Sequence, residues 1–393
     1  MDESKSENNI IYRQANIEDK DNLFQLYREV YPDQHEIKTS SLWAYEYLNN
    51  PNNEDDHNLS LWIALDENTG KIVGQSGVIY DKFKINTRTI KIGWGVDLVV
   101  HPQYRKKGIA INLQKTVCRD IDAYMIISMA LSTRLMCLKL GARIFPEVFQ
   151  LIFPVLPEKR RIPHYFQQKT LTNETLVNKV LRRIYKNNAF SSLIFNKVTV
   201  GFIRYLWKQK QKNVKQTENI TFIDYENDLE IKNIINDLWK KGREKYHNLT
   251  YRDWEHFSWK YFDHPVKKHK VFLLKVENEF IGYLVLRQGI GVEKNVGIVT
   301  DYFLIEEQND FFIDLSNFII NYFSNKEVDF IYLNTSVINH ARLFQSAGFQ
   351  KSRVHSPIFL SNDQTLYEAV DKYNNWFLTF SDHELDRYPV RGK

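Results

Sequence analysis

Apolar residues recur along this chain in two patterns, as short continuous runs and as runs at helical spacing. The continuous runs have strand length and lie at 60–66, 125–132, 269–276 and 330–335. Apolar residues at helical spacing fall at 108–122 and 310–324. Turn-forming residues at 66–70 and 277–279 separate neighbouring strands, which is typical of hairpins. Strands that alternate with helices in this way predict the α/β class.

The two halves of the chain share four sequence anchors in the same order. The anchors pair Tyr45–Pro51 with Trp259–Pro265, Lys71–Gly74 with Phe280–Gly282, Val96–Leu98 with Thr300–Tyr302, and Arg134–Gly141 with Arg342–Phe349. Their nearly constant spacing indicates a duplicated unit. Each unit is expected to run strand, helix, helix, three strands, helix, strand, helix and strand.

Length and charge divide the chain into four parts. With 393 residues, 43% of them hydrophobic, it can bury two cores. The net charge is +5, yet residues 157–219 hold 14 Lys or Arg against 3 Glu, so the rest of the chain is mildly acidic. Because the basic residues gather in one connecting segment, no nucleic-acid binding is expected. The expected parts are a domain at 1–156, a basic helical connector at 157–219, a second domain at 220–361 and a C-terminal tail at 362–393.

The connector allows two interpretations. Residues 176–207 carry apolar positions at helical spacing with Lys and Arg between them. Such helices can lie on an anionic membrane surface, and they can equally pack on the two domains with their charges in water. No apolar run reaches the ~20 residues of a transmembrane helix, and the polar N-terminus does not resemble a secretory signal. With only two cysteines, a cytoplasmic protein is expected, and peripheral contact with the inner face of the membrane stays open.

One segment combines the end of a strand, a basic turn and the start of a helix. The apolar run ending at Val100 meets Pro102, and Arg105-x-x-Gly108-x-Ala110 then opens the helix at 108–122. The free N–H groups of a first helical turn and the positive end of the helix dipole favour binding of a diphosphate. Gly108 and Ala110 are small, so they are expected to let phosphates approach the backbone closely.

This segment resembles the acyl-CoA motif of the GNAT acetyltransferase superfamily, (Gln/Arg)-x-x-Gly-x-(Gly/Ala) after a strand ending in Val-x-Pro. The resemblance implies two tandem GNAT-like domains, each a mixed sheet with helices on both faces. It also implies N-acetyltransferase activity with acetyl-CoA as co-substrate and no metal. In the superfamily, backbone amides at the strand end receive the thioester carbonyl, here Val99 and Val100. The CoA-binding residues would be Val100, Arg105, Lys106, Lys107, Gly108, Ile109 and Ala110.

The candidate general base lies on the same strand. Asp97 precedes Val99 by two residues, and strand alternation places both side chains on one face. Asp97 could take the proton of the acceptor's ammonium, although its recurrence as Asp301 in the second unit also fits a structural role. The Tyr that many relatives carry as acid is missing, which leaves Tyr124 and Cys137 as the nearest proton donors.

Aromatic residues that precede the second strand of each unit are expected to contact the acceptor; they are Trp43, Tyr45, Tyr47, Trp259 and Tyr261. Aromatic faces suit sugar rings or the apolar body of an amine, while core packing is the other interpretation of Trp259 and Tyr261. The second unit has Glu306, Glu307 and Asp310 where the first has its basic turn, so it is not expected to bind CoA.

Three functions follow as alternatives. The first is a CoA-dependent N-acyltransferase that acts on a small or sugar-like amine. The second is a Fem-type aminoacyl or peptidyl transferase of cell-envelope synthesis, which uses two GNAT-like units without a CoA cradle. The third is a non-catalytic CoA-binding protein of the same fold. The CoA motif favours the first. The acidic cluster of Asp382, Glu384 and Asp386 is interpreted as part of a solvated tail.

Overall fold

The computed structural model describes residues 9–155 and 220–382, apart from 33–34, 56, 146, 226–228, 290–294, 327, 329 and 373–374. The described residues form two compact units, each assembled from separate stretches of chain. The first unit draws on Met1–Phe145, His247–Val266 and Pro357–Asn374, and the second on Pro146–Tyr246, Lys267–Ser356 and Asn375–Lys393. Each unit is a mixed sheet with helices, as the sequence predicts.

The sheet of the first unit has the order β1-β2-β3-β4-β5-β15-β6, with β9 added to β3. Its strands are β1 (Ile10–Asn16), β2 (Asn58–Asp66), β3 (Lys71–Ile85), β4 (Arg88–Val100), β5 (Ala123–Ile126), β6 (Arg143–Ile144), β9 (Asn248–Thr250) and β15 (Ile358–Leu360). Among the described pairings of these strands, β4–β5 is parallel and the others are antiparallel. Such a mixed sheet gives β4 one antiparallel and one parallel neighbour.

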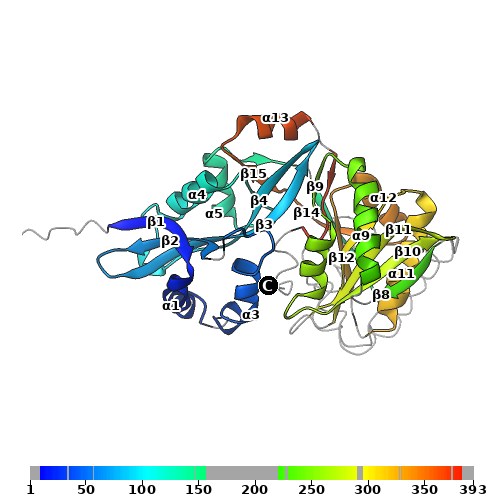
Figure 1. Cartoon of the computed structure of the whole chain (residues 1–393), viewed down its shortest axis with the longest axis horizontal. Helices are drawn as coiled ribbons and strands as arrows, with labels where there is room; N and C mark the ends of the chain where they lie inside the picture. The colour runs from blue at the N-terminus through cyan, green and yellow to red at the C-terminus, as the bar shows by residue number, and fades with distance from the viewer. Residues whose placement is uncertain are drawn as a thin grey trace, which may run out of the picture. The chain divides into compact units, whose positions relative to one another are not determined.

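Helices cover both faces of this sheet. They are α1 (Lys20–Val30), α2 (His35–Lys38), α3 (Ser41–Tyr47), α4 (Ile109–Asp120), α5 (Leu131–Lys139), α10 (Trp254–Phe257) and α13 (Gln364–Lys372), with short turns η1 (Ile17–Asp19), η2 (Pro102–Tyr104) and η4 (Ser258–Phe262). Helices α1 and α3 lie on one face of the sheet and α4 lies on the other (Figure 1). Leu98 and Val100 of β4 pack with α4, because their side chains join the core cluster of Ile109, Leu113 and Val117.

The sheet of the second unit has the order β14-β7-β13-β12-β11-β10-β8. Its strands are β7 (Val148–Pro154), β8 (Thr221–Tyr225), β10 (His269–Val276), β11 (Glu279–Gln288), β12 (Val296–Leu304), β13 (Phe330–Thr335) and β14 (Gln350–His355). Strand β16 (Trp376–Phe377) follows later in the chain and is not part of this sheet. Its helices are α9 (Leu229–Gly242), α11 (Asn309–Ser324) and α12 (Ile338–Ser346), with the turn η3 (Arg243–Lys245). The central strands repeat the arrangement of the first unit, since β12 is antiparallel to β11 and parallel to β13.

Each sheet contains a strand from the far end of the other half of the sequence. Strand β15 lies between β5 and β6 of the first unit and pairs antiparallel with both. Strand β7 lies between β13 and β14 of the second unit in the same manner. The expected boundaries at 156 and 361 therefore do not separate the two units, because pairing with distant strands assigns 147–155 to the second sheet and 357–361 to the first.

Two further expectations are corrected and one is left open. The apolar run at 125–132 is not one strand, since β5 ends at Ile126 and α5 begins at Leu131. Residues 362–382 are not a solvated tail, because 364–372 form α13 and Asp382 is buried, with its carboxylate accepting from Thr379 N at 2.6 Å. The basic connector at 157–219 lies outside the described residues.

Candidate functional site

The C-terminal end of β4 departs from regular strand geometry. Pairing with β5 covers only Ile92, Gly93 and Trp94, and β4 then continues to Val100. On its other side the register with β3 slips by one residue between Val96 and Val99, which marks a β-bulge. Asp97 lies in this bulge with φ of 49°, a left-handed conformation that Asp tolerates better than most residues.

The carboxylate of Asp97 has two side-chain partners from the helices below the sheet. Lys38 Nζ lies 2.6 Å from Oδ1, and the Tyr47 hydroxyl donates to Oδ2 at 2.8 Å. Both ionic side chains are nearly buried, with 7% of Lys38 and 11% of Asp97 exposed. Gln75 also donates to the backbone carbonyl of Asp97 at 3.3 Å. Asp97 is therefore a fixed, ion-paired carboxylate next to the end of β4.

The pairing with Lys38 is not predictable from the sequence. Lys38 stands in a short polar stretch without hydrophobic periodicity, 59 residues before its partner. The face of β4 on which Asp97 lies, by contrast, follows from strand alternation. Its side chain contacts α2 and α3, whereas Leu98 and Val100 pack with α4. The bulge interrupts strict alternation at this point.

The turn after β4 is exposed and positively charged. Arg105, Lys106, Lys107 and Gly108 are all exposed, and Lys106 and Gly108 have φ of 65° and 77°. A Cβ at Gly108 would meet no atom within 4 Å, so glycine is favoured there by its backbone conformation, with open space in front. Arg105 Nε donates to Val100 O at 3.2 Å and ties the turn to the strand end.

Helix α4 begins directly behind this turn. Its first backbone bond runs from Asn112 N to Gly108 O at 3.2 Å, so the N–H groups of Ile109, Ala110 and Ile111 have no acceptor within the helix. These N–H groups, the helix dipole and the three preceding cationic side chains together favour an anion at this end. The residues predicted to bind CoA are thus brought together in space.

Backbone direction distinguishes the two amides predicted to receive the carbonyl. His101 N donates to Val73 O at 2.8 Å, toward β3. Because successive N–H groups of a strand point to opposite sides, the Val99 amide also faces β3 and the Val100 amide faces away from it. On that side β5 has stopped pairing six residues earlier in β4. The geometry favours Val100 over Val99 as the donor.

The two candidate proton donors are both buried. Burial raises the pKa of the Cys137 thiol to about 11. The hydroxyl of Tyr124 lies against the backbone of β4, where a Cβ added to Gly95 would stand 2.0 Å from it. The thiol is neutral and the hydroxyl is tightly packed, so neither predicted proton donor is exposed.

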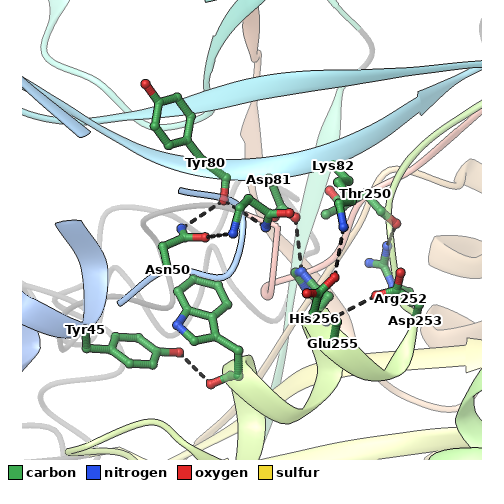
Figure 2. Close-up of polar contacts among 12 residues, drawn as sticks. Tyr45, Asn50, Tyr80, Asp81, Lys82, Thr250, Arg252, Asp253, Glu255 and His256 are labelled. Atoms are coloured by element: carbon green, nitrogen blue, oxygen red, sulfur yellow. Dashed lines mark hydrogen bonds and ion pairs between the residues drawn. The ribbon is translucent and has the colours of Figure 1, made fainter. Parts of the chain in front are cut away.

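The five aromatic residues predicted to contact the acceptor are core residues here, each less than 9% exposed. Tyr45 stacks on Trp259 at 4.8 Å between ring centroids and donates to its backbone oxygen at 2.8 Å. Figure 2 shows this contact beside the buried His256–Asp81 pair, which joins α10 to β3 at 3.1 Å. The burial and ring contacts of these residues favour the core-packing interpretation, and the Tyr47 hydroxyl reaches Asp97. Contact with the acceptor stays a prediction.

The equivalent place in the second unit holds a carboxylate that already has partners within the unit. Glu307, just before α11, contacts Lys245 Nζ at 3.0 Å, His340 Nε2 at 3.2 Å and the hydroxyl of Tyr246. Burial alone would raise the pKa of Glu307, but the bonds to His340 and Tyr246 and the charge of Lys245 outweigh it and hold the pKa at about 2. This unit carries no cationic, glycine-containing turn at 305–311.

Comparison with known proteins agrees with this geometry. A family model described as "Acetyltransferase (GNAT) domain" matches residues 11–130, which span β1 to the segment before α5. This stretch of the first unit is therefore similar to a GNAT acetyltransferase domain. The bulged β4 and the turn into α4 both lie inside the matched range. No curated protein matches the chain by sequence.

Solved structures with the same fold cover most of the chain. A GCN5-related N-acetyltransferase from Anabaena variabilis aligns with a TM-score of 0.55 at 12% identity, over 89% of this chain and 72% of that one. A probable N-acyltransferase from Enterococcus faecalis gives 0.55 at 8% identity, over 91% and 74%. The N-myristoyltransferase of Saccharomyces cerevisiae with bound myristoyl-CoA gives 0.52 at 13% identity, over 90% and 79%. These solved structures share the fold of the chain over most of its length, including both units.

The described residues contain no group of three or more His, Cys, Asp or Glu side chains that could hold a metal ion. Within the same residues no helix combines the length and the apolar character needed to span a membrane.

Proposed function

We propose that the protein is an N-acyltransferase that uses an acyl-CoA, with acetyl-CoA as the donor, and transfers the acyl group to an amine. The observation that carries the proposal is the exposed cationic turn at 105–108 in front of the unpaired N–H groups of α4. A CoA pyrophosphate supplies the anion that this end favours. The family match and the myristoyl-CoA bound to the yeast neighbour support a CoA thioester as the class of donor.

The chain's residues divide the reaction between them. The amides at the start of α4 and the side chains of Arg105, Lys106 and Lys107 hold the pyrophosphate. The Val100 amide, which faces away from β3, polarises the thioester carbonyl. Asp97 accepts a proton from the acceptor's ammonium, directly or through water, so that a neutral amine can attack. The thiolate leaves and takes its proton from solvent.

The test compares matched substitutions in the two turns. Gly108→Asp places a carboxylate in front of α4; the site has no atom within 4 Å of a new Cβ, and Asp tolerates the left-handed φ, so the fold should persist. CoA binding, measured by calorimetric titration, should fall below detection. Gln308→Asp at the matched turn of the second unit should leave CoA affinity unchanged. Equal loss in both variants, or no loss in either, contradicts the proposal.

A second measurement separates the alternatives. Release of CoA thiol from acetyl-CoA is followed with a panel of amines. Binding without thiol release with any amine would indicate a non-catalytic CoA-binding protein. Absence of CoA binding in the unaltered protein would favour the aminoacyl transferase class, whose members lack the CoA cradle.

A further inference from the structure

The ion pair at the β4 bulge joins the proposed base to a primary amine of the protein itself. Lys38 Nζ lies 2.6 Å from Asp97, and both side chains are nearly buried. The carboxylate is held on its other oxygen by Tyr47 and on its backbone by Gln75. It thus has a fixed position, three residues before the Val100 amide. In the structure this carboxylate pairs with an alkylammonium group, that of Lys38.

We propose that Asp97 and Tyr47 form the binding site for the acceptor's ammonium and that Lys38 occupies it as a tethered stand-in. The inference rests on the proposed acyltransferase function and names its substrate class, a primary alkyl amine. A carboxylate that is largely withdrawn from water gains most from a cation that approaches it directly. The side chain of lysine and a primary alkylamine substrate present the same ammonium group to it.

The surroundings of Lys38 allow the exchange. The Tyr31 ring centroid lies 4.6 Å from Lys38 Nζ, so the ammonium keeps a cation–π partner when the acceptor takes its place at Asp97. Lys38 is the last residue of α2, a helix of only four residues. Moving its side chain from the carboxylate toward the ring requires rotation of side-chain torsions rather than movement of the sheet.

The site also predicts a side reaction when no acceptor is present. The ammonium of Lys38 gives a proton to Asp97 and becomes a neutral amine. Its nitrogen attacks the carbonyl carbon of acetyl-CoA, an N–C bond forms, the C–S bond breaks, and the thiolate leaves and is protonated. The products are N-acetyl-lysine, CoA thiol and one proton released to solvent. Lys38 should therefore be acetylated by the protein's own activity.

The principal experiment replaces the tethered amine by a free one. Lys38→Ala removes Cγ to Nζ, and n-propylamine supplies those three carbons and the nitrogen. With acetyl-CoA, this variant should form N-propylacetamide at least about tenfold faster than the unaltered protein, because the amine is held in place beside Asp97. Lys82→Ala is the matched control, since Lys82 forms a similar pair with Glu255 at 2.8 Å and should gain nothing.

The outcomes are distinct from those of the function test. If Lys38→Ala binds CoA but makes no more N-propylacetamide than the Lys82→Ala control, the stand-in proposal is wrong while the acyltransferase function stands. If the unaltered protein does not bind CoA, the proposed function itself fails.

A measurement on the unaltered protein covers the case in which Lys38→Ala does not fold. After incubation with acetyl-CoA alone, peptide mass mapping should find Lys38 acetylated before Lys82, although Lys82 is 43% exposed and Lys38 7%. Gly108→Asp should abolish the modification of Lys38 and leave the slow chemical modification of Lys82. Modification of Lys82 ahead of Lys38 would overturn the proposal.

Discussion

The ends of β4 and β12, which precede the turns into α4 and α11, have the same pattern of backbone pairing. Gly74 pairs with Val100 and Gly282 pairs with Leu304. Val100 lies three residues after Asp97 in β4, and Leu304 lies three residues after Asp301 in β12. The next residue along donates its N–H back to the preceding strand in both units, His101 to Val73 and Ile305 to Ile281, each at 2.8 Å. Each long strand also slips by one residue in register near its aspartate.

The two turns differ in where the negative charge comes from. In the first unit, three exposed cationic side chains precede the unpaired amides of α4 and favour an anion from outside the chain; they are Arg105, Lys106 and Lys107. In the second, Glu307 is an internal anion already paired with Lys245 and His340. The shared backbone pairing therefore does not select a ligand by itself; the side chains placed on it do.

Matched substitution of the two aspartates gives the largest expected difference. Asp97→Asn should lower acyl transfer about a hundredfold with CoA affinity unchanged, because a general base contributes that much or more. The deficit should be greatest at low pH, where the acceptor amine is protonated. Asp301 is fully buried and accepts from Tyr283 at 2.8 Å and Thr379 at 2.7 Å. Asp301→Asn should instead cost about 2–3 kcal/mol of unfolding free energy.

Steady-state rates of thiol release across pH and urea unfolding separate the two effects. If Asp97→Asn leaves turnover unchanged at every pH, Asp97 has no part in proton transfer, and the two aspartates are both structural.

Matched substitution of the two glycines gives the next largest difference. A Cβ at Gly282 would stand 2.2 Å from the backbone oxygen of Phe303, so Gly282→Ala must shift the strand and should cost about 2–4 kcal/mol. At Gly74 the nearest atoms are Ile109 Cγ2 and Val99 O, both at 3.2 Å. Gly74→Ala should cost about 1 kcal/mol and weaken CoA binding by displacing α4. Denaturant unfolding and calorimetry measure the two; equal costs would show that the strand ends are packed alike.

The internal anion should be visible in the pH dependence of stability. The pKa of Glu307 falls from 4.5 to about 2 on folding, so its contribution is present above pH 4.5 and is lost as the pH falls toward 2. Because this carboxyl is partly open to solvent, the contribution is about 1–2 kcal/mol. Glu307→Gln should flatten the stability profile below pH 4.5.

Glu306→Gln is the control for that profile, since Glu306 accepts only a 3.3 Å bond from exposed Gln308 among the described contacts. Burial lowers the pKa of His340, so protonation of this group also destabilises the fold as the pH falls below 6.5. That second effect has the same sign and acts at higher pH, which keeps the two distinguishable. A Glu307→Gln profile identical to that of the unaltered protein would mean that Glu307 is not the internal anion.

Local pattern predicted much of this fold. The strands at 269–276 and 330–335 have the bounds that their apolar runs indicate, and the helices at 108–122 and 310–324 are α4 and α11 within a few residues. The cationic turn at 105–108 was also predictable, because strand end, turn and helix start are contiguous in sequence. Periodicity records such neighbours along the chain.

Features that depend on distant residues were not predictable in this way. The partners of Glu307 lie in other elements: Lys245 and Tyr246 precede it by 62 and 61 residues, and His340 follows it by 33. Lys38 is similarly remote from its partner Asp97. The short apolar runs at 148–154 and 358–360 indicate strands but carry no sign of which sheet accepts them. The β-bulge at Asp97 could not be predicted either, because the sequence there is that of an ordinary strand.

Strand β15 also determines when the first sheet can be completed during synthesis of the protein. The first sheet has a place between β5 and β6 that only residues 358–360 fill. A ribosome that has released β5 must therefore add more than 200 further residues before that row of backbone groups is satisfied. Until then the edge of β5 is open to mispairing, and a chain stalled in its middle would expose it to chaperones and proteases. The cationic turn at 105–108 therefore belongs to a sheet that is completed only after residues 358–360 have been added.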